Sequence, residues 1–424
     1  MNKQINRLVP ELRFPEFLSN SGWEGVYGNK AFEQINNKNH NSDFPILAIT
    51  QEYGAIPREM IDYNVSVTEK SVQSYKVVDV GNFIISLRSF QGGIEYSEYK
   101  GLCSPAYVIL RNKKGINKRF FKQYFKTKSF IRDLTKNLEG LRDGKMISYK
   151  QFSEILLPKP SPEEQQKIAD CLASIDELIT LHTQKLNALK DHKKGLMQQL
   201  FPAEGETKPK LRFPEFSGNA EWNELPLSQF IKSLDAGVSV NSTDRPANLN
   251  EKGILKTSSV ANGYFEPLDN KAVVEPIEQL RLKQSVKKDT IIISRMNTPS
   301  LVGANGYVEA DIDNIFLPDR LWAAKPQPGT YMRFISCILS SSKGRATLSE
   351  LATGTSDSMK NITKTDVLKI RIRVPTLEEQ KRVADFISSI DKTISFQAAK
   401  IDELKNHKNG LIQKLFPIMD GVVS

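Results

Sequence analysis

The chain has 424 residues, of which 39% are hydrophobic and 25% charged, and its formal net charge is +10. This length accommodates about three domains of ordinary size, and the composition is that of a globular protein. No run approaches the roughly 18 apolar residues that cross a membrane, and the first residues contain no apolar core of signal-peptide type. We therefore expect a cytoplasmic protein with no membrane partner.

The net charge indicates which kind of partner the protein binds, and the cysteines indicate whether it contains a disulfide or a metal site. Positive charge favours a polyanion, because neutralised phosphates release counterions, although an unremarkable basic protein would carry the same charge. The three cysteines, Cys103, Cys171 and Cys337, form no C-x-x-C pair and have no histidine cluster nearby. We expect free thiols, and no metal site in this chain.

The most informative feature is an internal repeat. Residues 10–17, PELRFPEF, return as PKLRFPEF at 209–216, and 20 of the 40 positions in 163–202 are identical to those in 378–417. The intervening stretches, about 23–157 and 222–372, share few identities. The order along the chain is therefore variable, constant, variable, constant, which indicates two different modules in one repeated frame.

Each variable module begins with short runs typical of strands and closes with a helical stretch. The strand-like runs are 44–50, 82–93 and 104–110 in the first module and 253–259, 290–297, 301–303 and 317–322 in the second. Aromatic residues near 120–130, including Phe121 and Phe125, are expected in the core and not as platforms for stacked bases.

A strand followed by Ser-x-Arg or Ser-Arg and then a polar, glycine-rich turn occurs in both modules. Arginine hydrogen-bonds guanine, and asparagine or glutamine hydrogen-bonds adenine, in the major groove. Glycine and asparagine in these turns also suit an ordinary hairpin. We predict DNA contact for the turns as a group, with lysines positioned to touch phosphates. The candidate DNA-binding residues are Arg58, Arg88, Ser89, Gln91, Lys145, Ser258, Arg295, Asn297, Asn305 and Lys360.

Each constant segment predicts one long helix. Ser161 and Thr376 are expected N-caps, each followed three residues later by a glutamate that would complete a capping box, and each helix should end near a Phe-Pro pair. Apolar residues then recur in alternating steps of four and three, which is a heptad seam. The seam residues are Ile168, Leu172, Ile175, Ile179, Leu186, Leu189, Val383, Ile387, Ile390, Ile394, Ile401 and Leu404, and the matching polar interruptions are His182 with Gln397 and Lys193 with Lys408.

An unpaired seam would leave many aliphatic side chains in water, so we expect the two helices to pack against each other. At about 1.5–3 kcal/mol for each buried aliphatic side chain, the gross gain is large enough to favour pairing. The prediction is an α+β protein with two globular domains separated by two long antiparallel helices packed as a coiled coil, with a pseudo-two-fold internal repeat. A helix of this length spans roughly 57 Å at 1.5 Å per residue.

The two LRFPEF segments, the two Glu-Glu-Gln helix starts and the two Gly-Leu-x-Gln-x-Leu-Phe-Pro helix ends resemble the DNA-specificity subunits of type I restriction–modification systems. The resemblance covers essentially the whole chain. It implies two target recognition domains that each recognise half of a bipartite, non-palindromic site in double-stranded DNA. It also implies two methyltransferase subunits docked on the helices and two restriction or motor subunits that can join them.

The same resemblance implies a non-catalytic chain without a cofactor of its own. S-adenosylmethionine, ATP and magnesium would belong to the partner subunits, which methylate adenine N6 or cleave DNA. No methylase, dinucleotide, P-loop or zinc-protease motif is present in the sequence. Two alternatives remain, a coiled-coil scaffold that does not bind DNA and a self-contained DNA-modifying enzyme. The expected divisions are 1–160 and 222–375 for the target recognition domains, 161–202 and 376–417 for the helices, and 203–221 for the linker.

Overall fold

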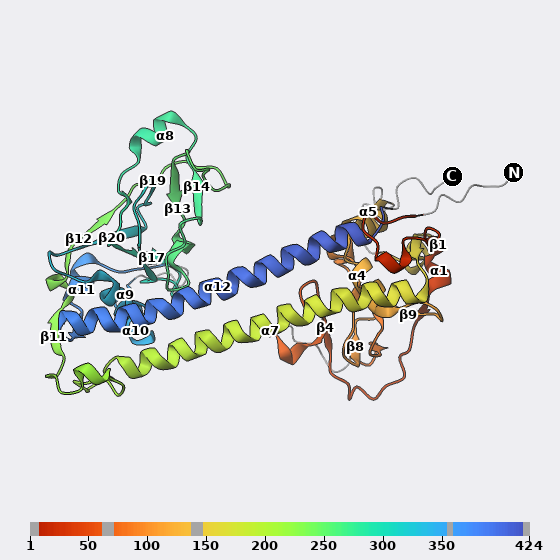
Figure 1. The fold of residues 1–424 in the computed structure, drawn as a ribbon, viewed down its shortest axis with the longest axis horizontal. Coiled ribbons are helices and arrows are strands. Elements are labelled where there is room, and N and C mark those ends of the chain that lie inside the picture. The colour runs from red at the N-terminus through yellow and green to blue at the C-terminus, as the bar shows by residue number, and fades with distance from the viewer. Residues whose placement is uncertain (1–7, 62–71, 137–146, 354–358, 419–424) are drawn as a thin grey trace. The chain divides into compact units, whose positions relative to one another are not determined.

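The computed structural model describes residues 8–61, 72–136, 147–353 and 359–418 (Figure 1). The chain divides into two compact units, residues 1–183 with 399–424 and residues 184–398. Both divisions fall inside the long helices α7 (Pro162–Leu200) and α12 (Leu377–Leu415). Each unit therefore contains a globular domain, the first part of one long helix and the last part of the other.

The first unit is built on a four-stranded antiparallel sheet with the strand order β2-β9-β6-β7. Smaller antiparallel pairs, β1–β10, β3–β4 and β5–β8, complete its strands. The strands are β1 (Glu24–Tyr27), β2 (Phe32–Ile35), β3 (Leu47–Thr50), β4 (Gly54–Pro57), β5 (Lys76–Val78), β6 (Phe83–Ile85), β7 (Glu95–Tyr96), β8 (Gly101–Cys103), β9 (Val108–Asn112) and β10 (Leu156–Lys159). The short helices are α1 (Gly28–Ala31), α3 (Ser89–Gly92), α4 (Lys118–Tyr124), α5 (Lys128–Thr135) and α6 (Tyr149–Ser153).

The second unit repeats the four-stranded main sheet with a different sequence, but its smaller strands pair differently. Its main sheet has the order β12-β20-β16-β18, a second sheet has the order β14-β13-β19-β15, and β11–β22 and β17–β21 form separate pairs. The strands are β11 (Asn223–Pro226), β12 (Ile231–Ala236), β13 (Gly253–Leu255), β14 (Asn270–Ala272), β15 (Ser285–Val286), β16 (Ile291–Ser294), β17 (Met296–Asn297), β18 (Asn305–Tyr307), β19 (Ile312–Phe316), β20 (Leu321–Pro326), β21 (Lys360–Asn361) and β22 (Arg371–Val374). The short helices are α8 (Pro276–Arg281), α9 (Met332–Ser340), α10 (Ser342–Glu350) and α11 (Lys364–Lys369).

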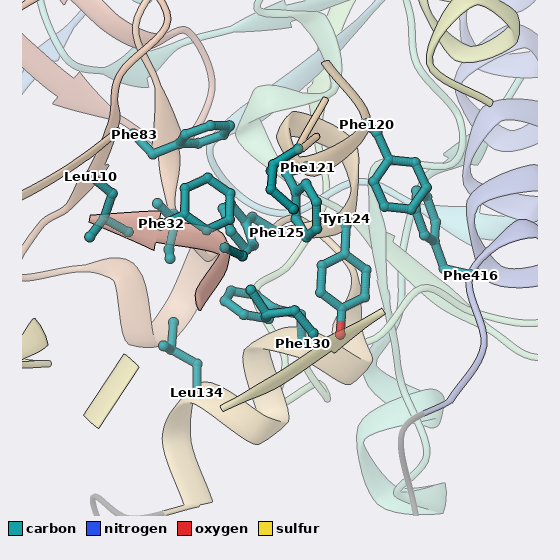
Figure 2. Packing of buried hydrophobic residues seen from close by; sticks show 14 of the residues in the cluster. Phe32, Phe83, Leu110, Phe120, Phe121, Tyr124, Phe125, Phe130, Leu134 and Phe416 are labelled. Carbon is teal, nitrogen blue, oxygen red and sulfur yellow. The ribbon is translucent and has the colours of Figure 1, made fainter. Parts of the chain in front are cut away.

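Aromatic side chains fill the core of the first unit, as Figure 2 shows. Phe121 and Phe125 are fully buried, which agrees with their predicted place in the core. Phe416, just beyond the end of α12, packs its ring 5.1 Å from that of Phe120. In the second unit Phe201, just beyond the end of α7, lies 5.7 Å from Phe334. Each repeated Phe-Pro pair therefore ends a helix and also anchors that end in a domain core.

The long helices begin and end as predicted. Their first turns are capped by the hydroxyls of Ser161 and Thr376, which accept hydrogen bonds from the backbone amides of Glu164 at 3.3 Å and Glu379 at 3.5 Å. The predicted seam residues are all buried or half-buried. In each unit the start of one helix shares a core with the end of the other, so the antiparallel packing is confirmed within each unit.

Two lysines interrupt the seams, and each forms an ion pair with the other helix. Lys193 lies 2.6 Å from Asp391 in the second unit, and Lys408 lies 2.6 Å from Asp176 in the first. Both lysines and both aspartates occupy equivalent positions in the repeat. A single repeated pair of residues thus joins the helices with the same antiparallel register in both units.

The repeated LRFPEF segment clasps the start of each long helix. Arg13 donates from Nε and Nη2 to the two carboxylate oxygens of Glu164, at 2.7 and 2.8 Å, while Nη1 donates to Asn20 O and Nη2 also donates to Ser21 O. Arg212 makes the same two-point contact with Glu379, at 2.8 and 2.7 Å. The hydrogen bonds that Arg13 donates to Glu164 raise the pKa of Arg13, and both side chains are almost entirely buried.

This clasp corrects the prediction of a capping box. The cap hydroxyls are in place, but among the described residues the carboxylates of Glu164 and Glu379 accept hydrogen bonds from arginines and not from the cap amides. The next residue in each helix, Gln165 or Gln380, donates to the carbonyl of the proline that precedes the cap, at 2.9 Å in both copies. The predicted strand at 301–303 is also wrong, because these residues form a turn and β18 begins at Asn305.

Candidate nucleic-acid interface

The equivalent strands β6 and β16 each run into a polar turn. Turn 1 comprises residues 87–93 after β6, and turn 2 comprises residues 295–303 after β16. Ser86 and Ser294, the serines that precede the turns, are buried. The Ser86 amide donates to Ser89 Oγ at 2.9 Å, and the Gly303 amide donates to Ser294 O at 2.7 Å. Local hydrogen bonds therefore close both turns without a partner molecule.

In turn 2, Arg295 is held between strands. Its backbone amide donates to Arg320 O and its carbonyl accepts from the Ile362 amide, both at 3.0 Å. Its guanidinium lies 5.9 Å from the ring of Trp322, and among the described residues its buried Nε atom has no hydrogen-bond partner. An arginine whose guanidinium lies near an aromatic ring is suited to donate hydrogen bonds to a nucleic-acid base or phosphate.

The pairing of β17 with β21 brings two more candidates together. Asn297 and Lys360 are direct partners in this antiparallel ladder, and both are half-buried. The amide of Asn297 also serves its own turn, since it donates to Ser294 Oγ at 3.2 Å and accepts from the Thr298 amide at 2.9 Å. The structure thus brings Lys360, which is far away in sequence, beside Arg295 and Asn297.

Turn 1 presents its candidates differently. Arg88 is exposed at the start of α3, and Gln91 is exposed within it. Gln51, in the hairpin between β3 and β4, donates to Arg88 O at 3.4 Å. Arg58 is half-buried in the 3-10 helix that follows β4.

Two candidates are buried and two lie apart from these groups. Ser89 is 1% exposed and accepts the hydrogen bond from Ser86, and Asn305 is 0% exposed and donates to the backbone oxygens of Gly303 and Leu339. These two side chains are therefore committed to folding the turns. Ser258 is exposed on a separate 3-10 helix in the second unit. Lys145 lies outside the described residues.

Sequence reasoning missed two residues beside the turns. Gln51 in the first unit and Arg320 in the second are both exposed and both touch the backbone of a candidate arginine. Arg320 directly precedes β20, the neighbour of β16, so a correct strand pairing would have placed it beside turn 2. Gln51 gives no such signal, because its contact depends on how the β3–β4 hairpin folds over α3.

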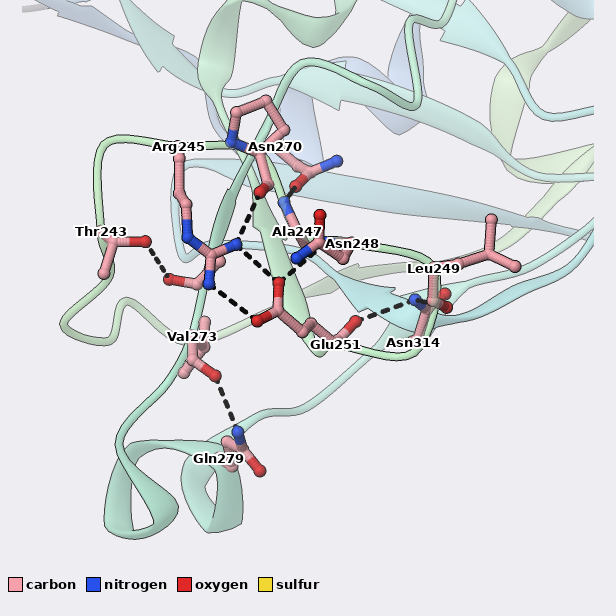
Figure 3. Close-up of polar contacts among 12 residues, drawn as sticks. Thr243, Arg245, Ala247, Asn248, Leu249, Glu251, Asn270, Val273, Gln279 and Asn314 are labelled. Atoms are coloured by element: carbon pink, nitrogen blue, oxygen red, sulfur yellow. Dashed lines mark hydrogen bonds and ion pairs between the residues drawn. The ribbon is translucent and has the colours of Figure 1, made fainter.

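A second polar cluster of the second unit is satisfied internally, as Figure 3 shows. Arg245 forms two hydrogen bonds with Glu251, at 2.6 and 2.7 Å, and this pairing lowers the pKa of Glu251 to about 2. Asn270 accepts from the Ala247 amide at 2.8 Å, and Asn314 donates to the backbone oxygens of Leu249 and Glu251. These bonds fix the loop before β13, so this cluster is less suited than the turns to bind a ligand.

Other features of the described residues bear on the class of site. No group of three histidine, cysteine, aspartate or glutamate side chains could hold a metal ion within the described ranges. Burial raises the pKa of the Cys103 and Cys337 thiols to about 12. None of the described helices is long and apolar enough to cross a membrane.

The chain belongs to the family of type I restriction modification DNA specificity domains, whose model matches residues 26–191 and 219–406. It is 26% identical over 369 residues to the type I restriction enzyme MjaVIII specificity subunit of Methanocaldococcus jannaschii. The alignment covers 83% of this chain and 81% of that relative. The chain is 22% identical over 397 residues to the putative MjaX specificity subunit of the same organism, which covers 88% of this chain and 86% of that one.

The fold agrees with two solved structures. The crystal structure of the type I restriction–modification S subunit from M. genitalium matches with a TM-score of 0.56 and 14% identity, over 97% of this chain and 100% of that one. A chain from a study of the assembly and conformational transition of a type I system matches with a TM-score of 0.51 and 17% identity, over 95% and 98%. Within its family the protein is a specificity subunit, the non-catalytic component that recognises DNA sequence.

Proposed function

We propose that the two domains each recognise one half of a bipartite, non-palindromic site in double-stranded DNA. The observation that carries this proposal is that the same four-stranded main sheet, with a polar turn after the equivalent strand, occurs twice with unrelated turn sequences. Identical turns would favour identical half-sites. Different turns offer different hydrogen-bonding groups, so the two halves of the target should differ.

The contacts are assigned to the exposed and half-buried candidates. The first half-site would be contacted by Arg88 and Gln91 of turn 1 and by Arg58, which follows the β3–β4 hairpin. The second half-site would be contacted by Arg295 and Asn297 of turn 2. Lys360 and Lys145 would contact phosphates, which position a protein without specifying sequence. Ser258 is retained as a separate candidate of the second domain.

The domain divisions follow the repeat. Residues 1–160 and 222–375 would be the target recognition domains, 161–202 and 376–417 the helices that set their spacing, and 203–221 the linker. The helices would also dock two methyltransferase subunits, which two restriction or motor subunits can join. In this arrangement S-adenosylmethionine, ATP and magnesium are bound by the partners, and the complex acts on DNA in the cytoplasm.

The experiment is long-read mapping of methylated adenine in cells with and without this gene. We expect one motif that disappears with the gene and consists of two dissimilar half-sites around an unspecified spacer. A single continuous palindrome would contradict the proposal. If no methylated motif depends on the gene although the complex assembles, the alternative of a scaffold that does not bind DNA is favoured.

A further inference from the structure

Side chains of one helix, α10, hydrogen-bond the backbone of turn 2. Arg345 donates from Nη1 to Val302 O at 3.1 Å and from Nη2 to Ser300 O at 3.2 Å. Ser349, one turn further along the helix, donates from Oγ to Pro299 O at 3.3 Å. Three backbone carbonyls of a single turn are therefore held by two side chains of the same helix.

The end of turn 2 is also pressed against α10. Gly303 has a φ of 74°, which L side chains rarely adopt, and a Cβ atom on it would lie 2.6 Å from Leu348 Cβ and 3.1 Å from Arg345 Nη1. The Arg345 side chain is partly withdrawn from water, and this burial lowers its pKa. Such an arginine is costly to bury unless its donors are used, and two of its nitrogens donate to the backbone of turn 2.

Turn 1 has a similar arrangement built from other residues. Lys126, between α4 and α5, donates to Gly92 O at 3.0 Å and forms an ion pair with the buried carboxylate of Glu95 at 2.5 Å. Gly93 has a φ of 78°, and a Cβ atom on it would lie 2.0 Å from Phe125 O. In both units a glycine with positive φ lets the turn approach the helical layer closely, and a cation from that layer holds a turn carbonyl.

We propose that Arg345 and Lys126 are positioning residues, which determine the sequence specificity of the two half-sites by fixing the backbone of turn 2 and turn 1. The inference rests on the proposed function, in which these turns contact DNA. Hydrogen bonds to base edges require placement to within about 0.5 Å. The two cations act through the turn backbone and need not touch DNA themselves.

The test compares Arg345→Met and Arg345→Lys in the full chain assembled with its methyltransferase partners. Methylation of DNA libraries randomised in either half-site measures discrimination at each. We expect Arg345→Met to lower discrimination at the second half-site about 10-fold, the loss expected from one or two hydrogen bonds, with the first half-site unchanged. Arg345→Lys keeps the charge and one donor and should recover part of the loss.

The reciprocal variant acts on turn 1. Lys126→Met alone would leave the Glu95 carboxylate buried without its cation, so it is combined with Glu95→Gln. This double variant should lower discrimination at the first half-site and leave the second unchanged. Arg371→Met is the matched control, because Arg371 also donates to a backbone oxygen, Glu224 O at 3.0 Å, but lies on β22 outside both turns.

Arg295→Ala separates this inference from the proposed function. If Arg295→Ala relaxes the second half-site and Arg345→Met does not, the positioning role is refuted and the proposed function stands. If Arg295→Ala leaves discrimination at both half-sites unchanged, the proposed contact of turn 2 with DNA is refuted, and the positioning role of Arg345 is refuted with it. Should Arg345→Met prevent assembly, Arg345→Lys decides: unaltered discrimination at the second half-site overturns the proposal, and a selective loss there supports it.

Discussion

At the scale of single residues, two arginines that follow equivalent strands lie in different surroundings. Arg88 and Arg295 each follow a buried serine at the end of β6 or β16, but Arg88 is exposed at the start of a short helix, whereas the Arg295 guanidinium lies 5.9 Å from the Trp322 ring. The two arginines therefore approach a ligand from different backbone conformations. Their neighbours Ser89 and Asn305 have the right chemistry for bases but are buried, because the turns use them for their own hydrogen bonds.

Replacing either arginine should affect only one half-site. We expect Arg88→Ala to relax the first half-site and Arg295→Ala the second, each by about 1–3 kcal/mol, which is the range for a base-contacting arginine. Binding of the assembled complex to DNA with single-base changes in each half measures this. Arg111→Ala is the control, because this exposed arginine pairs with Glu33 on the strands. Equal weakening on every sequence would instead assign the two arginines to phosphates.

At the scale of elements, the repeated segments form clasps between the LRFPEF motif and the first turn of each long helix. The glutamate of each clasp lies near the positive end of the helix dipole and accepts two hydrogen bonds from a buried arginine. The copies differ in one respect. Trp222 Nε1 also donates to Glu379 at 3.2 Å, whereas Trp23 Nε1 has no hydrogen-bond partner among the described residues.

This difference predicts unequal effects of removing the two arginines. Arg13→Ala leaves the Glu164 carboxylate buried without its cation and should destabilise the first unit by about 3–5 kcal/mol. Arg212→Ala should cost less, because Trp222 still donates to Glu379. Hydrogen exchange of the amides in the first turns of α7 and α12 measures each loss locally.

A second variant tests the cause of the loss. Combining Arg13→Ala with Glu164→Gln removes the uncompensated charge and should restore part of the stability. If the double variant is as unstable as Arg13→Ala alone, packing of the arginine stem, and not the buried carboxylate, accounts for the effect.

At the scale of the whole molecule, the chain contains two units with the same organisation. Each unit combines a domain, the start of one long helix and the end of the other, and each contains one lysine–aspartate pair between the helices. Under the proposed function, the length of the helices determines how far apart the two half-sites lie on DNA.

Shortening both helices by one heptad tests this directly. Deleting residues 180–186 and 398–404 keeps the seam pattern and both lysine–aspartate pairs but removes about 10 Å of helix. We expect the spacer of the methylated motif to shorten by about three base pairs, with both half-site sequences intact. The control is a full-length variant in which the exposed residues Gln184 and Lys185 are replaced by alanine. A change in either half-site sequence would refute the modular assignment.

The sequence by itself determined the repeat, the two long helices with their caps and ends, the seam that pairs them and the family. These features are local or periodic: a heptad seam predicts burial of one helix face wherever the partner lies, and a Phe-Pro pair ends a helix in any context. Tertiary structure decided which partners distant residues find. Arg13 meets Glu164, Arg345 lies beneath residues 299–303, and Ser89 and Asn305 turn inward. Such contacts depend on how strands pair and how helices pack across the sheet, and no spacing within the chain encodes the distance between two side chains that meet only after folding.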